Sequence, residues 1–266
     1  MFLVFVSKAV FMIIAIANQK GGVGKTTTAV NIGGCLARQG QRVLLVDMDP
    51  QGNAATCLGV SKRSLQYTIG DVLVDALPAQ DAIVPTGRPG YDLLPATPDL
   101  AGATLALADL PQRDLQLRTA LAPLHASYDY ILIDCPPSLG LLTINALAAA
   151  NQVLIPLQCE YLALEGLAQL KQTVDAVREH LNPALHIGGV AMTMYDGRAN
   201  LARQVVAEVR RFFPNRVFGT LVPRTVRLSE APSHGELAYE YDPRSRGAQA
   251  YSNLTNELLA RREATR

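Results

Sequence analysis

The stretch "NQKGGVGKTTT", residues 18–28, is the most informative segment of this 266-residue chain. It follows a short apolar run, "IIAIAN" (13–18), and precedes an alanine-rich segment that extends to Gly40. An apolar strand, a glycine-rich turn and a helix start form a phosphate-binding loop, because the free N–H groups at a helix start bind anions. Glycine tolerates the backbone angles that aim successive N–H groups at one phosphate. The segment therefore predicts a nucleotide-phosphate site on an α/β fold.

Around this loop, short aliphatic runs alternate with longer amphipathic stretches, a pattern typical of a parallel sheet with helices on both faces. The expected strands are nearly continuous apolar runs over 13–18, 42–47, 91–96, 128–134, 152–157, 187–194 and 216–222. The expected helices span 25–39, 139–149, 161–180, 200–213 and 247–262. No repeat or linker interrupts the series, so we predict one doubly wound, mostly parallel α/β domain of the P-loop NTPase type over residues 12–262. The region 60–120 carries scattered proline, glycine and aspartate, and apart from the strand at 91–96 it predicts no definite helix.

Charge and cysteine usage exclude several classes of protein. The net charge of +1 argues against a chain that is basic throughout. The charge is unevenly placed, however, since residues 198–227 hold seven arginines and one acidic residue, Glu208. The cysteines form no CxxC or Cys/His pair, which argues against a zinc or redox site and favours reduced, buried thiols. The four are Cys35, Cys57, Cys135 and Cys159.

The N-terminal segment "MFLVFVSKAVF", residues 1–11, is apolar but lacks the basic start and the cleavage site of a signal peptide. It is either an upstream-start artefact before Met12 or a short interfacial anchor. The chain has no apolar run of about 18 residues that could span a membrane. We therefore expect a cytoplasmic protein with no membrane partner.

The residues of the loop are predicted to have separate roles. Lys25 is expected to neutralise the β and γ phosphates, and the Thr26 hydroxyl to take one Mg²⁺ position. Gln19 stands where the ordinary pattern GxxxxGK[ST] has its first glycine, and Lys20 leads a KGGxGKT variant instead. The predicted phosphate-binding residues are Lys20, Gly21, Gly22, Val23, Gly24, Lys25, Thr26 and Thr27.

The KGGxGKT variant resembles the loop of the deviant Walker A ATPases. In that family the extra lysine reaches the nucleotide of the facing subunit. The resemblance implies that Lys20 acts only in an ATP-bound homodimer, whereas a solvated loop lysine is the alternative.

Two later segments place carboxylates at the carboxyl edge of the sheet, where ligands of open α/β sheets bind. "VDMDPQGN" contributes Asp47 and Asp49, and "YILID" ends on Asp134, the Walker B position. Carboxylates beside a triphosphate act through Mg²⁺ or an ordered water. By resemblance Asp49 polarises the attacking water, while Asp47 and Asp134 lie at Mg²⁺, Asp134 through water. Capping of the turn before Pro50 is the alternative for Asp47 and Asp49.

Several segments narrow the resemblance to the ParA/Soj partition ATPases: "NQKGGVGKTTTAVNIG", "VLLVDMDPQGNAATCLGV", "YILIDCPPSLGLLTINAL" and "MTMYDGRANLARQVVAEVR" occur in the same order. This resemblance implies slow, Mg²⁺-dependent ATP hydrolysis with Lys20, Lys25 and Asp49 as catalytic residues. It also implies an ATP-bound homodimer that binds double-stranded DNA nonspecifically on the nucleoid. Release is expected when a ParB/Spo0J-like centromere-binding protein stimulates hydrolysis, in the segregation of a chromosome or a plasmid.

The arginines of residues 198–227 are the candidates for the DNA contact, because arginine neutralises phosphates without reading bases. By its place in "YDGR", Arg198 ranks first, ahead of Arg203 and Arg227. A solvated helix face is the alternative for the lower-ranked arginines. "VPRTVRLSEAP", 222–232, resembles the loop beside the adenine base, so Pro223 and Arg224 are predicted to bind nucleotide. Whether Arg224 serves adenine or DNA stays open.

The main rival is a MinD-like membrane-associated division-site ATPase. It would share the phosphate loop but end in a basic amphipathic helix with large apolar residues. The tail "AQAYSNLTNELLARREATR", 248–266, has modest apolar content. A nitrogenase-type iron protein would need two suitably placed cysteines per subunit, and a capsule-type tyrosine kinase would carry a tyrosine-rich tail. The sequence fits neither of these last two patterns.

Overall fold

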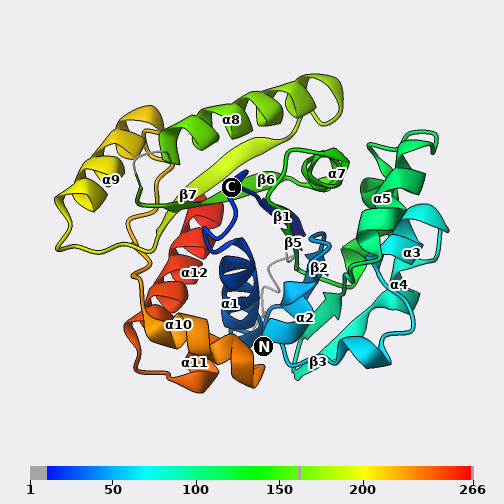
Figure 1. Cartoon of the computed structure of the whole chain (residues 1–266), viewed down its shortest axis with the longest axis horizontal. Helices are drawn as coiled ribbons and strands as arrows, with labels where there is room; N and C mark the ends of the chain where they lie inside the picture. Colours follow the sequence, from blue (N-terminus) through cyan, green and yellow to red (C-terminus); the bar gives the residue numbers. More distant parts are fainter. Residues whose placement is uncertain (1–10, 161–162, 265–266) are drawn as a thin grey trace, which may run out of the picture.

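The computed structural model describes residues 11–160 and 163–264, whose strands form one seven-stranded sheet (Figure 1). The order is β3-β4-β2-β5-β1-β6-β7, and every neighbouring pair is parallel except β3 and β4. The strands are β1 (Met12–Ile16), β2 (Val43–Asp47), β3 (Val84–Arg88), β4 (Tyr91–Leu94), β5 (Tyr130–Asp134), β6 (Gln152–Gln158) and β7 (His186–Thr193).

Helices cover both faces of this sheet. Successive strand residues point to opposite faces, so Ile13 and Ala15 pack in one apolar core with α3–α9, and Ile14 and Ile16 pack in the other with α1, α2 and α12. Figure 1 shows α1 and α12 side by side. The helices are α1 (Lys25–Arg38), α2 (Asn53–Cys57), α3 (Ile69–Val74), α4 (Ala79–Ala82), α5 (Leu100–Ala108), α6 (Gln116–Leu121), α7 (Leu141–Ala149), α8 (Ala163–His180), α9 (Asn200–Phe212), α10 (Val226–Glu230), α11 (Ala238–Tyr241) and α12 (Arg246–Ala264).

The doubly wound, mostly parallel α/β class predicted from the sequence is confirmed, and the five expected helices correspond to α1, α7, α8, α9 and α12. The first two residues of the expected helix 161–180 lie outside the described residues, as does all but Phe11 of the predicted 1–11 extension. Within the described part of the chain, no helix is both long and apolar enough to cross a bilayer.

One expected strand is wrong and one strand was not expected. Residues 216–222 run beside β7 and are joined to it by separated backbone hydrogen bonds and the isolated bridge of Val190 with Val217. A second isolated bridge, Tyr195 with Pro223, lies just beyond both segments. The segment 216–222 bulges away from β7 between the bridges, so no regular ladder forms. β3 carries a proline and a glycine, which interrupt the apolar pattern and suit an antiparallel edge strand.

Candidate nucleotide and metal site

Two glycines of the loop between β1 and α1 have left-handed backbone angles. Gly22 has φ 74° and Gly24, the N-cap of α1, has φ 88°. A Cβ atom at either position would meet nothing within 4 Å, so the backbone angle, rather than crowding, requires glycine. No side chain caps this end of α1 in the described structure. Its first N–H groups therefore remain available to an anion.

Lys25 lies in the first turn of α1 and is only 7% exposed. Its Nζ donates to the carbonyl oxygen of Lys20 at 3.2 Å. Burial lowers the pKa of Lys25, while the nearby carboxylates of Asp134 and Asp49 oppose this shift. A buried ammonium whose hydrogen-bond partner is a single carbonyl is well suited to an anionic ligand.

Asp47 and Asp134 end the neighbouring strands β2 and β5 and lie opposite each other in the register. Both oxygens of Asp47 accept backbone N–H groups, from Asp49 at 3.0 Å and from Ala54 at 3.1 Å. Burial raises the pKa of Asp47 to about 7, although these two hydrogen bonds lower it. Asp47 thus caps the turn that leads into α2, and Asp49 caps the same turn by accepting from the N–H of Gln51 at 3.0 Å.

Asp134 differs from Asp47 in having no such partners. It is 1% exposed, and among the described residues neither carboxylate oxygen has a hydrogen-bond partner. Burial raises the pKa of Asp134 well above its usual range and the charge of Asp47 raises it further, while the Thr26 hydroxyl and Lys25 act in the opposite direction. An unpaired buried carboxylate is costly unless a cation satisfies it.

These residues fit a Mg²⁺ ion. Asp134 and the Thr26 hydroxyl supply the oxygen ligands that Mg²⁺ prefers. No cluster of three or more His, Cys, Asp or Glu that could hold a metal by itself occurs in the described ranges. Mg²⁺ usually binds through one or two carboxylates, waters and substrate phosphates. Among the two predicted carboxylate ligands, the geometry favours Asp134, because the oxygens of Asp47 are engaged by the backbone.

Lys20 lies on the outer side of the loop. Its backbone N–H donates to Asn18 Oδ1 at 3.0 Å, and Asn18 Nδ2 donates to the carbonyl oxygen of Pro156 at 2.7 Å, which ties the loop to β6. Its Nζ forms an ion pair with Glu160, two residues beyond β6, and the Lys20 side chain is 43% exposed. In the single chain Lys20 is therefore accessible and paired with a surface carboxylate.

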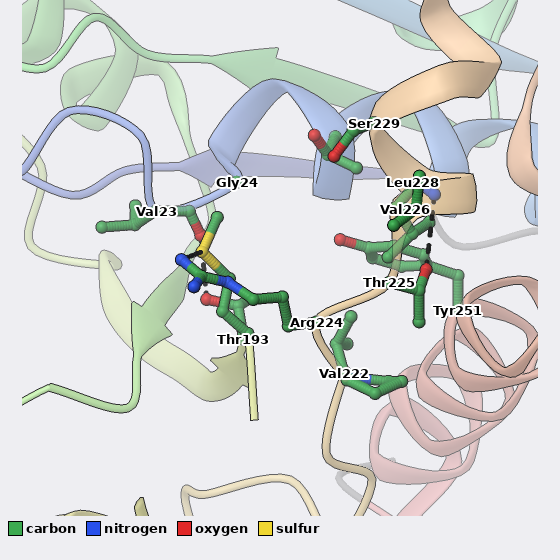
Figure 2. A pocket seen from close by; sticks show the side chains of 13 residues that line it. Val23, Gly24, Thr193, Val222, Arg224, Thr225, Val226, Leu228, Ser229 and Tyr251 are labelled. Atoms are coloured by element: carbon green, nitrogen blue, oxygen red, sulfur yellow. Dashed lines mark hydrogen bonds between the residues drawn. The ribbon is translucent and has the colours of Figure 1, made fainter. Parts of the chain in front are cut away.

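A cavity of about 430 Å³ opens beside the phosphate loop (Figure 2). Pro223 and Arg224 form part of its wall, so the structure brings both predicted nucleotide residues next to the loop. The hydroxyl of Thr193 donates to the carbonyl oxygen of Val23 at 2.9 Å and thereby joins β7 to the loop. The cavity is lined by Val23, Gly24, Thr27, Thr193, Met194, Val222, Pro223, Arg224, Thr225, Val226, Leu228, Ser229 and Tyr251.

Three of these lining residues have no local signal in the sequence. Thr193 ends β7 and Met194 follows it, while Tyr251 lies on α12 with its hydroxyl 3.2 Å from Thr28 Oγ1. Burial raises the pKa of Tyr251 to about 12, although the hydrogen bond with Thr28 lowers it, so the phenol stays neutral. The positive φ of Met194, 51°, is the only unusual backbone feature among them, and a sequence pattern cannot reveal it.

The predicted DNA-binding arginines fall into two places. Arg198 is 92% exposed and pairs with Asp196 through two nitrogens, each at 3.0 Å. Arg203, in the first turn of α9, donates to the carbonyl oxygen of Gly197 at 3.2 Å, beside Arg198. Arg227 lies on α10 instead and pairs there with Glu230 at 3.0 Å and Asp242 at 3.5 Å.

The chain is similar to known proteins over most of its length. A family model described as an AAA domain matches residues 11–187. The sporulation initiation inhibitor protein Soj of Bacillus subtilis is 56% identical over 248 residues, which are 93% of this chain and 98% of that protein. The chromosome partitioning protein ParA of Myxococcus xanthus is 55% identical over 94% of this chain and 88% of its own length.

The fold is shared with a solved structure from Mycobacterium smegmatis. That protein, described as cobyrinic acid a,c-diamide synthase with bound ATP analogue and magnesium, superposes with a TM-score of 0.85 at 40% identity and covers 97% of this chain and 98% of its own. The shared fold alone does not distinguish the reaction, but the identity with Soj and ParA, 56% and 55%, is higher than the 40% identity with this protein. The chain belongs to the Soj/ParA family of chromosome-partitioning ATPases.

Proposed function

We propose that this protein is a Mg²⁺-dependent ATP hydrolase that partitions DNA by cycling between a monomer and an ATP-bound homodimer. The observation that carries the proposal is Asp134, a buried carboxylate with no hydrogen-bond partner in the described structure, beside Lys25 at the phosphate loop. This arrangement leaves both charges to be satisfied by a ligand. A magnesium nucleotide supplies the opposite charge to each of them.

In the proposed reaction, the N–H groups at the start of α1 and the Lys25 ammonium bind the phosphates and stabilise charge on the transferring phosphoryl group. Thr26 and Asp134 hold Mg²⁺, which would neutralise developing charge on the phosphate oxygens. Asp49 orients the attacking water. It is buried at the edge of the sheet, with one oxygen accepting from Gln51.

Lys20 completes the site from the facing subunit in this proposal. Its present partner, Glu160, is about as exposed as Lys20 itself. Exposed ion pairs contribute at most about 1 kcal/mol, so Lys20 can exchange this carboxylate for a nucleotide phosphate at little cost. The slow basal rate expected of the isolated chain follows from the absence of this lysine from its own phosphate site.

Arg198 and Arg203 form the proposed contact with double-stranded DNA, and the binding is nonspecific because exposed arginines neutralise phosphates without reading base edges. A ParB/Spo0J-like partner would stimulate hydrolysis and release the protein from the nucleoid. A membrane-bound role like that of MinD is disfavoured by α12, whose Tyr251, Leu254 and Leu258 are buried in the core. This apolar face is therefore not free to lie on lipid.

The test is the steady-state ATPase rate of the purified protein, measured alone, with nonspecific DNA, and with DNA plus the cognate ParB-like protein. We expect a slow rate alone and stimulation of about tenfold or more only when DNA and partner are both present. A rate that depends on lipid vesicles and not on DNA would support the MinD-like alternative and overturn the proposal.

Lys20→Ala tests the dimer. Size-exclusion chromatography with a non-hydrolysable ATP analogue should show a dimer for the wild-type protein and a monomer for the variant, while both bind the nucleotide. Lys171→Ala is the matched control, because Lys171 is an exposed α8 lysine that also pairs with a carboxylate, Asp175. An ATP-dependent dimer of Lys20→Ala at wild-type levels would rule out the role given to Lys20.

A further inference from the structure

The outer wall of the cavity is built by residues 216–224, here called the wall loop. The wall loop is hydrogen-bonded to β7 at both ends. The N–H of Val190 donates to the carbonyl oxygen of Arg216 at 2.9 Å, and the N–H of Phe218 donates back to Val190 at 3.0 Å. Further along, the N–H of Val222 donates to the carbonyl oxygen of Met192 at 2.9 Å. Residues 222–224 then line the cavity directly.

Between these attachments the wall loop is longer than the strand beside it. Residues 219–221 separate Phe218 from Val222, whereas Ala191 alone separates their partners Val190 and Met192. The extra residues bulge out of register, and their N–H groups have no carbonyl partner on β7. A backbone N–H left without a partner is costly, so the position of the bulge depends on where these groups find an acceptor.

For two of these three N–H groups, the acceptor is a side chain of α12. Glu257 Oε1 accepts from the N–H of Gly219 at 2.7 Å, and Glu257 Oε2 accepts from the N–H of Thr220 at 3.1 Å. Burial raises the pKa of this carboxyl, but the two backbone hydrogen bonds and the charge of Arg261 outweigh burial and lower it. The charged carboxylate is therefore the form that holds the bulge.

Arg261, one turn further along α12, completes the arrangement. Its guanidinium donates to the carbonyl oxygens of Arg216 at 2.9 Å and Val217 at 2.8 Å, and to Glu257 at 3.0 Å. The same guanidinium lies 3.9 Å from the ring centroid of Phe218, which is fully buried. Glu257 thus accepts from backbone N–H groups of the wall loop, and Arg261 donates to its carbonyl oxygens. Both contacts lie immediately before the residues that line the cavity.

We propose that Glu257 is a positioning residue for nucleotide binding, which sets the register of the wall loop and so places Val222, Pro223 and Arg224 against the base. The inference rests on the proposed function, because it takes the cavity as the base site. Glu257 does not line the cavity, and its effect passes through the backbone of the wall loop. α12 also connects Glu257 directly with the cavity, because Tyr251, about two turns before Glu257 on the same helix, lines it.

The experiment compares Glu257→Ala and Glu257→Gln in the full-length protein, with two ligands measured by calorimetry in the presence of Mg²⁺. ATP presents the base and the phosphates, and inorganic tripolyphosphate presents the phosphates alone. We expect Glu257→Ala to bind ATP about tenfold more weakly. Glu257→Gln should lose about threefold, because its amide can accept from one N–H but turns a second donor toward the other. Tripolyphosphate affinity should stay at the wild-type value in both variants.

Glu179→Gln is the matched control, since it removes the same charge from an exposed position of α8. Wild-type ATP affinity in Glu257→Ala would overturn the inference. Equal loss of ATP and tripolyphosphate binding would show that Glu257 supports the fold in general, and would overturn it too. Absence of ATP binding by the wild-type protein would instead overturn the proposed function, and the inference with it.

Discussion

The phosphate loop and the wall loop lie on two sides of one cavity and are held in different ways. The phosphate loop is a continuous segment whose conformation follows from two glycines with positive φ and from the start of α1. The wall loop depends on partners far along the chain, Val190 and Met192 on one side and Glu257 on the other. Lys25 and Asp134 on the phosphate side are buried, whereas Arg224 on the base side is exposed. The backbone angles of the first side are set by its own glycines, with Asn18 and Thr193 tying it to β6 and β7, whereas the second side depends on tertiary contacts throughout.

The largest effect is expected from Lys25→Ala, on the phosphate side. Removing the buried ammonium takes away the charge that would stabilise the transferring phosphoryl group, and loss of one such donor typically lowers turnover by about 100-fold or more. The measurement is phosphate release at saturating ATP, with Lys171→Ala as control, because Lys171 is an exposed lysine of α8 that pairs with Asp175. Turnover within about threefold of wild type would contradict the placement of the phosphates at Lys25.

Asp134→Asn should have the next largest effect. The substitution keeps the shape of the side chain but removes the charge proposed to hold Mg²⁺. The gain in ADP affinity on adding Mg²⁺ should therefore be about tenfold smaller in the variant than in the wild-type protein. The same change removes an unpaired buried carboxylate. The melting temperature of the nucleotide-free protein should therefore rise.

Calorimetry with ADP, in Mg²⁺ and in EDTA, measures the first effect, and thermal unfolding measures the second. Asp109→Asn serves as control, because Asp109 is an exposed residue at the end of α5. If the variant kept the full Mg²⁺ dependence, Asp134 would not be a metal-holding residue. If its melting temperature fell, the carboxylate would have a partner that stabilises the folded protein.

The same contrast explains which parts of the molecule could be predicted from the sequence. The phosphate loop and the strand ends at Asp47 and Asp134 follow from local patterns, because buried parallel strands are continuous apolar runs and their carboxyl ends meet at one edge. Residues 216–222 show the same apolar pattern, yet form no strand. Their bulge is stabilised by a side chain 38 residues later, Glu257, which no local pattern reveals.

The ion pair of Lys20 and Glu160 was unpredictable for a related reason. The two residues are 140 positions apart and come together only because β6 lies beside β1 in the sheet. The cavity shows the same limit, since Met194 and Tyr251 reach it from separate elements. The sequence thus locates the phosphate loop from a local pattern and the environment of the base only through resemblance.

Arg224→Ala should have a moderate effect and tests the two uses considered for this residue. Because Arg224 lines the cavity next to the phosphate loop, ATP affinity should fall about threefold and DNA affinity should stay unchanged. Arg198→Glu is the complementary variant and should lose DNA binding in moderate salt while keeping ATP affinity. Fluorescence anisotropy with labelled duplex DNA measures DNA binding, and calorimetry measures ATP binding. Weaker DNA binding by Arg224→Ala with unchanged ATP affinity would assign Arg224 to the DNA surface.

A separate effect is a pH dependence of stability on the phosphate side. Burial raises the pKa of Asp47 from 3.8 to about 7 in the folded protein. Between these two values the unfolded chain releases a proton that the folded protein keeps, so the free energy of unfolding falls as the pH rises from about 4 to about 7 and then levels off. Below about 4 both states hold the proton and the stabilisation is fully present.

Thermal unfolding of the nucleotide-free wild-type protein and of Asp47→Asn, from pH 5 to pH 8, measures this contribution. The wild-type melting temperature should decline relative to that of the variant as the pH rises, because only the wild-type carboxyl titrates. Parallel curves would mean that Asp47 is already ionised in the folded protein across this range. In that case the N–H groups of Asp49 and Ala54 would outweigh the burial of the charge, and Asp47 would resemble an ordinary capping aspartate at a turn.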